Sequence, residues 1–231
     1  MPSDRKLLDE QVAYYRARAA EYDEWFNREG RYDRGPLQRA HWFEEVATVD
    51  AALRDMAPLG DVLELACGTG IWTARLAAIA SRVRAIDASP EAVAINRARV
   101  GAAHVSYLVA DIFDMAAPPP ADFVFFSFWL SHVPSASFEP FWQFVRGALR
   151  GGGRVFFVDS LLEPSSMAID HERPSDAGVV RRKLNDGRTF TIVKQFYDPA
   201  GLQRRLSALG WRADVRSTGT YFLYGTAEPV A

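Results

Sequence analysis

The sequence of 231 residues supplies enough material for a full hydrophobic core, and its 48% hydrophobic and 24% charged residues are ordinary for a water-soluble protein. A net charge of −2, without a block of five or six basic residues, leaves no electrostatic footprint for nucleic acid. One cysteine excludes an internal disulfide framework, and the lack of a leader-like or spanning apolar run predicts a cytoplasmic protein that does not enter a membrane.

The first two predicted elements are helices. Apolar residues at steps of three and four indicate one helix over residues 7–26, with Tyr22 and Trp25 on the shared face. Glycines and a proline interrupt this pattern between residues 27 and 36. A second helix follows, with its apolar face spread over residues 43–56.

From residue 61 onward, predicted strands alternate with predicted helices. The strands are expected at residues 61–66, 82–87, 105–109, 121–128 and 154–159. The helices are expected at residues 70–80, from Ser89 onward with serine as its N-cap, and at residues 138–149. Strands that are apolar on both faces and alternate with helices indicate a parallel sheet covered on two sides.

The last third of the chain predicts a hairpin, a helix and two more strands. Asn185-Asp186-Gly187 is a strong turn signal between strands at residues 179–184 and 189–196. A helix at residues 199–209 and two antiparallel strands at residues 211–218 and 221–226 follow. The hairpin is a candidate lid or a candidate homodimer contact, because an isolated two-stranded ribbon is rarely stable.

We expect a single domain over residues 1–231. Its predicted parts are an N-terminal helical lid (1–35), a cofactor-binding core (36–160), an insertion with the hairpin (161–196) and a C-terminal helix with a strand pair (197–231).

A glycine-containing loop follows the first strand of the core. Gly68 and Gly70 lie where a helix N-terminus would offer N–H groups to a ligand. A nicotinamide-binding loop would carry a third glycine where Thr73 stands, and no Gly-Lys-Ser/Thr follows, so neither a pyrophosphate loop nor a P-loop is indicated.

Carboxylates end the next two strands. Asp87 is suited to accept hydrogen bonds from a ribose diol, and Asp111 with the apolar Ile112 is suited to an adenine ring. Because carboxyl ends of parallel strands share one edge, the loop and both acids are expected to form one nucleoside site.

These features resemble the class I S-adenosylmethionine-dependent methyltransferases, and their small-molecule branch in particular. The resemblance rests on "VLELACGTG", "AIDAS", "VADIFD" and "FVFFSFWLSHVP", with an N-terminal "YY…RA.EYDEW" helix, and covers roughly residues 10–225. It implies an α/β, Rossmann-like fold whose seven-stranded, mostly parallel sheet has an antiparallel last strand and helices on both faces.

The resemblance implies a set of cofactor-binding residues. They are Tyr14, Arg18, Tyr22, Glu64, Ala66, Cys67, Gly68, Gly70, Asp87, Ala88, Asp111, Ile112, Ser127 and Phe128. Ala66 stands where the family has glycine, so a slightly tighter loop is expected. Cys67 is interpreted as a buried apolar filler rather than a nucleophile, and the tyrosines of the first helix either close over the cofactor or simply pack.

The predicted acceptor-binding residues are Trp25, Trp129 and His132, and no metal is expected because the four histidines show no ligand spacing. The predicted function is metal-independent methyl transfer from S-adenosylmethionine, with S-adenosylhomocysteine as product, to an oxygen or nitrogen of a small, partly aromatic or lipophilic acceptor. Carbon methylation of a quinone-like ring, and cofactor binding without methyl transfer, remain alternatives.

His132 is the predicted catalytic residue. A neutral imidazole after the fourth core strand could take a proton from the acceptor as a general base. The alternatives are a structural histidine that caps the turn before Pro134, and an acceptor that needs no base.

Overall fold

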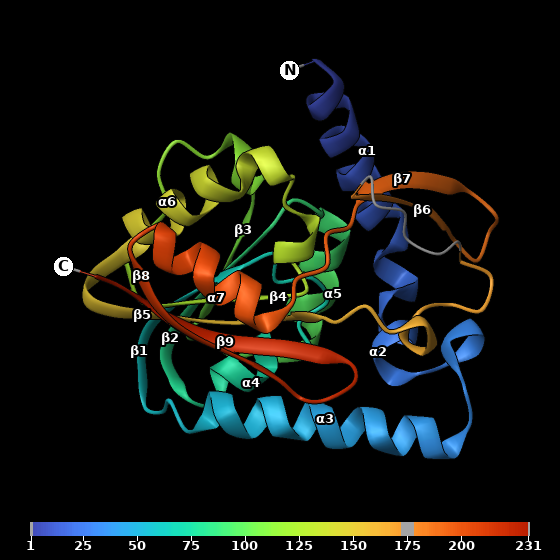
Figure 1. Ribbon diagram of the computed structural model, residues 1–231, viewed down its shortest axis with the longest axis horizontal. Coiled ribbons are helices and arrows are strands. Elements are labelled where there is room, and N and C mark those ends of the chain that lie inside the picture. The colour runs from blue at the N-terminus through green and yellow to red at the C-terminus, as the bar shows by residue number, and fades with distance from the viewer. Residues whose placement is uncertain (1, 172–177, 231) are drawn as a thin grey trace.

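The computed structural model describes residues 2–171 and 178–230, which form a mixed sheet with helices on both faces and a separate hairpin (Figure 1). Residues 172–177, within the predicted insertion, lie outside the described residues, as do the two terminal residues.

The main sheet has seven strands in the order β3-β2-β1-β4-β5-β9-β8. Their bounds are β1 Leu59–Leu65, β2 Ala80–Asp87, β3 Val105–Val109, β4 Ala121–Ser127, β5 Leu149–Ser160, β8 Trp211–Ser217 and β9 Phe222–Pro229. Strands β1 to β5 pair in parallel, and β9 runs antiparallel to both β5 and β8. This confirms the predicted sheet. Strand order reverses between β1 and β4, so a ligand crevice is expected at their carboxyl ends.

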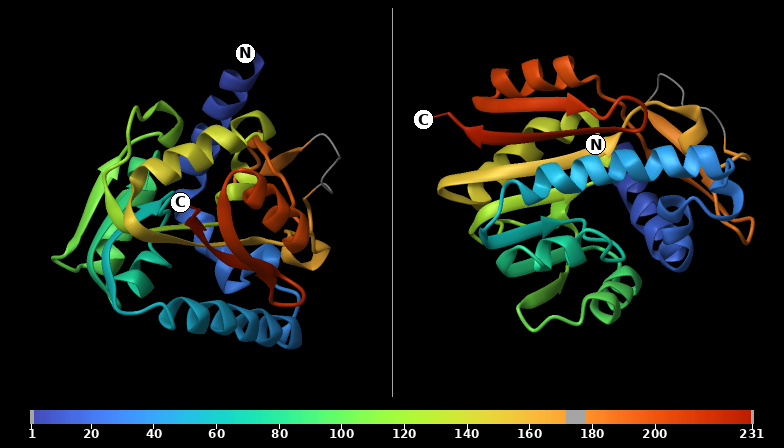
Figure 2. Two further views of the ribbon diagram at one scale, coloured as in Figure 1. Left: turned by 60° about the vertical axis from the view of Figure 1, so that its left-hand side comes forward. Right: turned by 90° about the horizontal axis from the view of Figure 1, so that it is seen from below.

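Five helices cover the faces of the sheet: α3 Pro36–Arg54, α4 Thr73–Ala77, α5 Pro90–Val100, α6 Phe138–Ala148 and α7 Pro199–Ala208. The phenylalanines of β4 alternate between two cores, as the pleat of a strand requires. Phe126 packs in the core beneath α6 and α7, whereas Phe125 packs in the core beneath α3 and α4. In Figure 1, α6 lies above the sheet and α3 below it, and Figure 2 shows α3 running across its face.

The N-terminal segment is broken where one continuous helix is predicted. Helix α1 (Pro2–Arg18) passes through a 3₁₀ turn (Ala19–Glu21) into a short helix, α2 (Tyr22–Asn27). The two helices pack against different partners, because α1 contacts the hairpin whereas Trp25 of α2 meets Trp42 of α3 with ring centroids 5.2 Å apart. One straight helix could not pack against both partners. The periodicity of the apolar residues carries no information on these tertiary contacts, so it predicts a single helix.

The hairpin of β6 (Val179–Lys183) and β7 (Thr189–Val193) packs on α1 (Figure 1). The buried amide of Gln11 spans the contact, donating to the carbonyl of His132 at 3.1 Å and accepting the Val193 amide at 3.1 Å. The hairpin thus finds its support within the chain, and its role in a homodimer stays a prediction. Across residues 2–171 and 178–230, no helix is long and apolar enough to cross a membrane.

Gly70 is expected to be required for folding because its backbone lies against α5. Its φ is +90°, and a Cβ there would lie 2.5 Å from Asn96 Oδ1 and 3.0 Å from Asn96 Cα. Gly70→Ala should therefore lower the free energy of unfolding by about 2 kcal/mol or more, from left-handed strain and overpacking together. The measurement is the urea midpoint at constant m-value.

The matched control is Gly101→Ala at the end of α5. Gly101 has φ +58°, and a Cβ there would meet nothing within 4 Å, so only the backbone strain of about 1 kcal/mol applies. Equal losses in the two variants would contradict a steric role for Asn96.

Candidate active site

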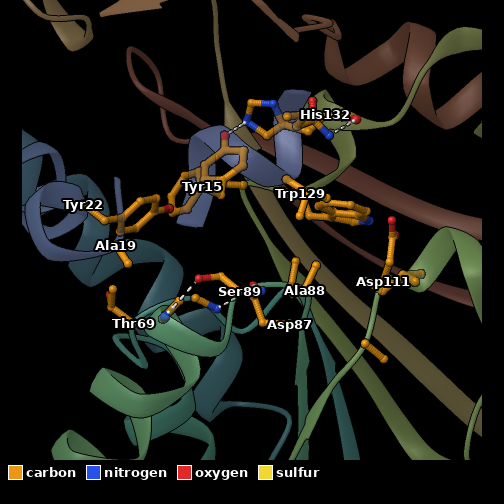
Figure 3. Close-up of a pocket in the computed structure, with 18 of the residues that line it drawn as sticks. Tyr15, Ala19, Tyr22, Thr69, Asp87, Ala88, Ser89, Asp111, Trp129 and His132 are labelled. Atoms are coloured by element: carbon orange, nitrogen blue, oxygen red, sulfur yellow. Dashed lines mark hydrogen bonds between the residues drawn. The ribbon is translucent and has the colours of Figure 1, made fainter. Parts of the chain in front are cut away.

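A cavity opens at the carboxyl ends of the first four strands. Each strand contributes lining residues: Ala66 and Gly68 after β1, Asp87 from β2, Asp111 after β3 and Ser127 from β4. Tyr15, Ala19 and Tyr22 face Asp87, Ala88 and Ser89 across it (Figure 3). Its position at the strand ends and its lining suit a nucleoside. We refer to it as the first cavity.

Asp87 joins two loops beneath the first cavity. Its Oδ2 accepts the Gly68 amide at 2.8 Å, and its Oδ1 accepts the Ser89 amide at 2.8 Å. Burial raises the pKa of this carboxyl, and the backbone N–H groups oppose that shift by stabilising the charged form. Each oxygen keeps acceptor capacity, so the carboxylate can hold the loops and still receive a diol.

Asp111 and Trp129 lie at the other end of the first cavity (Figure 3). Asp111 Oδ1 accepts the Phe113 amide at 3.0 Å, while Ile112 is buried beside it. The rings of Phe113 and Trp129 lie 5.4 Å apart at an angle of 37°. Trp129, predicted as an acceptor contact, lines the first cavity near Asp111 and not the second cavity described below, and Phe113 is an aromatic neighbour that is absent from the predicted residues.

The glycine loop holds residues with different tasks. Ala66, which lines the first cavity, has φ +53°, a conformation that favours glycine, so the substitution places strain in the loop rather than merely tightening it. Gly70 lines neither this cavity nor its neighbour and instead allows the close approach of α5. Cys67 is buried and burial raises the pKa of its thiol, consistent with an apolar filler.

Glu64 lies under the loop and outside the lining of the first cavity. Only 1% of it is exposed, and burial raises the pKa of its carboxyl to about 8. Within the described part of the chain, no donor makes a hydrogen bond of good geometry to either carboxylate oxygen, although the nearby Thr73 hydroxyl lowers the pKa. Such an unsatisfied buried acid calls for a ligand or a structural explanation.

A second cavity adjoins the first. The two share four lining residues: Tyr15, Tyr22, Phe128 and His132. Phe128 holds a φ of +51°, uncommon for an aromatic residue, and such strain concentrates at functional sites. Groups bound in the two cavities would meet at this shared wall.

The second cavity is lined by buried cations. Arg18, Arg182 and Lys194 are exposed by 8%, 7% and 9%, and all three line it. Burial lowers the pKa of Arg182, and it lowers the pKa of Lys194 to about 8. Among the described residues, Arg18 Nε and Arg182 Nη1 lack hydrogen-bond partners. Burying unpaired positive charge is costly, so the cavity is suited to an anion.

His132 is held at both ring nitrogens. Nδ1 lies 2.7 Å from the carbonyl of Val193, which can only accept, so Nδ1 carries the proton. Nε2 then accepts from the hydroxyl of Tyr15 at 2.7 Å, drawn as a dashed line in Figure 3. Burial and the nearby Lys194 hold the imidazole pKa well below its ordinary value. This geometry favours an orienting role, and a role as general base stays a prediction.

Two of the remaining predicted residues line the second cavity, and one lines neither. Trp25, predicted as an acceptor contact, and Arg18, predicted for the cofactor, both line the second cavity. Tyr14 lines neither and is buried against Phe190 of the hairpin, with ring centroids 5.7 Å apart. The aromatic residues of α1 therefore both line the cavities, as Tyr15 does, and pack against the hairpin, as Tyr14 does.

Arg182 and Lys194 line the second cavity but are absent from the predicted site residues. Arg182 lies on the same face of β6 as the buried Val180, so a basic residue at an inward strand position is the signal that the sequence offers. In the described ranges, no cluster of three or more His, Cys, Asp or Glu side chains could hold a metal ion.

Comparisons with known proteins agree with this arrangement. A family model described as "Methyltransferase domain" matches residues 62–153. A structure described as a DhpI-SAM-HEP complex is 42% identical in sequence, with a TM-score of 0.79, and the match covers 96% of this chain and 98% of that one. A DhpI-SAH complex is 40% identical with a TM-score of 0.78, covering 97% of each chain. The chain belongs to the class I S-adenosylmethionine-dependent methyltransferases.

Curated relatives of this methyltransferase cover less of its length. A ubiquinone biosynthesis O-methyltransferase of Xanthomonas campestris pv. campestris (strain B100) is 30% identical over 142 residues, which is 58% of this chain and 57% of that protein. The match therefore spans little more than half the length of that relative.

We expect the His132 imidazole of this methyltransferase to stay neutral as the pH falls through about 6.5, the ordinary value for the group. Burial and the neighbouring cations depress its pKa, so protonation requires a lower pH. Ring-nitrogen NMR should report protonated Nδ1 and an accepting Nε2 throughout. The urea-denatured protein is the control, and native titration near 6.5 would contradict the assignment.

Proposed function

We propose that the protein transfers a methyl group from S-adenosylmethionine to an oxygen of a small anionic acceptor. The observation that carries this proposal is the pair of adjoining cavities, one with the strand-end carboxylates Asp87 and Asp111 and the other lined by three buried cations. The cation lining favours a carboxylate or phosphate group over the partly aromatic or lipophilic acceptor expected from the sequence.

The residues of the first cavity fit the cofactor. Asp87 would receive the ribose diol, Asp111 and Ile112 the adenine, and the backbone from Ala66 to Gly68 the methionine part. The unsatisfied Glu64 beneath the loop supports a cationic group nearby, such as the methionine ammonium. When bound, S-adenosylmethionine would supply an activated methyl group, whose carbon an acceptor oxygen would attack in line, so that an O–C bond forms as the C–S bond breaks and S-adenosylhomocysteine leaves.

The residues of the second cavity would orient the acceptor. Arg18, Arg182 and Lys194 come from α1, β6 and the residue after β7, so they can surround one anionic group from different sides. Tyr15 stands at the wall shared with the first cavity, and its hydroxyl proton points to His132. Tyr15 oxygen can then accept from a donor on the acceptor molecule and fix its approach.

Oxygen is the target atom that these features favour. The curated relatives carry the name O-methyltransferase. A carboxylate or phosphate oxygen is already deprotonated at neutral pH, so its methylation needs alignment and exclusion of water rather than a base. This agrees with a His132 whose two nitrogens are both engaged.

The test of this function uses methyl-labelled S-adenosylmethionine with a panel of small carboxylic and phosphoric acids. Label should appear in an ester of an acid that carries a second polar group, and the matching neutral amides should give no product. Label on neutral aromatic compounds, with none on the acids, would contradict an anionic acceptor.

Asp87→Ala should weaken S-adenosylhomocysteine binding. The loss of charge-assisted hydrogen bonds to the diol costs on the order of 1.5–3 kcal/mol for each bond. Calorimetry measures this, with Asp114→Ala as the control, because Asp114 is half-exposed and pairs with Arg5 away from the cavity lining. Unchanged affinity in Asp87→Ala would contradict the assignment of the first cavity to the nucleoside.

A further inference from the structure

Lys194 is held by a buried network at the edge of the second cavity. Its Nζ donates to Ser131 Oγ at 2.8 Å and lies 3.6 Å from Asp159 Oδ1. Ser131 and Asp159 are each exposed by only 1%. The network joins the turn after β4, the end of β5 and the segment after β7.

Asp159 is itself fixed by the backbone. Its Oδ2 accepts the Ser131 amide at 2.8 Å and its Oδ1 accepts the Ser160 amide at 2.7 Å. These bonds stabilise the charged carboxylate and set its position independently of Lys194. The backbone therefore fixes the carboxylate in place, and the ammonium group of Lys194 forms an ion pair with it.

The other charged or titratable groups that face Lys194 are cationic or neutral. Arg182 of β6 and Arg18 of α1 lower its pKa, after burial, whereas Asp159 raises it. His132, on the turn after β4, lies in the same lining, and burial and the nearby cations keep it neutral. Tyr15 of α1 and Tyr22 of α2 complete this side. Within the described part of the chain, Asp159 is thus the carboxylate that offsets the burial of this ammonium group.

We propose that Asp159 is a positioning residue, which keeps Lys194 charged and directed into the second cavity and so sets the pH range over which the cavity holds an anion. The inference rests on the proposed function, since it takes the second cavity as the site of an anionic acceptor. Asp159 acts through Lys194 and not by touching the acceptor.

The sign of the pH dependence follows from this arrangement. The pKa of Lys194 is about 8, so the charged form is present below that pH and is lost as the pH rises through it. Removing the Asp159 charge should lower the pKa of Lys194 by about one unit or more, the usual effect of an opposite charge at this range. Anion binding should then be lost at a correspondingly lower pH.

The experiment measures sulfate binding by calorimetry on protein saturated with S-adenosylhomocysteine, because the charge of sulfate is constant over the range tested. In the same samples, NMR of the lysine side chains follows Lys194 directly. The sequence has three lysines, and the other two, Lys6 and Lys183, are exposed. Asp159→Asn should move both the titration of Lys194 and the loss of sulfate binding to lower pH by about one unit or more.

Two further variants separate positioning from a structural role. Lys194→Arg keeps its charge over the whole range, so it should remove the loss of binding near pH 8, both alone and combined with Asp159→Asn. Ser131→Ala removes the hydroxyl acceptor but leaves the carboxylate, and it should move the titration less than Asp159→Asn. If Asp159→Asn does not fold, Asp159→Ser takes its place, because serine keeps an acceptor for the Ser131 amide.

Each outcome decides the proposal. Sulfate binding whose pH dependence is the same in wild type and Asp159→Asn overturns it, even if the variant is less stable. If sulfate fails to bind the wild type at any pH, the anionic acceptor of the proposed function fails. The Lys194 titration then still decides the role of Asp159: a shift to lower pH supports it and an unchanged titration overturns it.

Discussion

The site depends on two hydrogen bonds made by the side-chain amide of Gln11. Buried between α1, the turn after β4 and β7, it satisfies one backbone acceptor and one backbone donor at once. A buried amide that loses its partners costs more than the bond itself contributes, so this contact fixes α1 in one register on the hairpin. Tyr15 and Arg18 lie further along the same helix, and their positions over the two cavities follow from that register.

Buried cations under the hairpin give the second cavity a positively charged lining. Three cations share a small volume, and among the described residues Asp159 is the carboxylate close to Lys194. Their mutual repulsion and desolvation work against folding, and the packing of the hairpin core around Tyr14 and Ile192 offsets this cost. An anionic ligand would relieve the repulsion, so affinity and stability are linked through the same groups.

The sheet could be predicted from the sequence because its signals are local. Alternating strands and helices, the Ser89 cap and the Asn185 turn all act within a few residues, and the structure confirms the seven-stranded sheet with an antiparallel last strand that the family resemblance implied. The second cavity could not, because Arg18 and Arg182 are brought together only when the hairpin packs on α1. The close approach of Gly70 to α5 could not be predicted either, because Asn96, which it meets, lies in another helix and 26 residues further along the chain.

The hairpin shares no ladder with the main sheet, since β6 and β7 pair only with each other in the described residues. Its inward residues can therefore be exchanged without shifting the register of any strand that carries the nucleoside loops. Under the proposed function, acceptor preference can then change while the strand-end carboxylates that serve the cofactor stay the same. Such a change needs only residues of this hairpin and of the helix on which it packs.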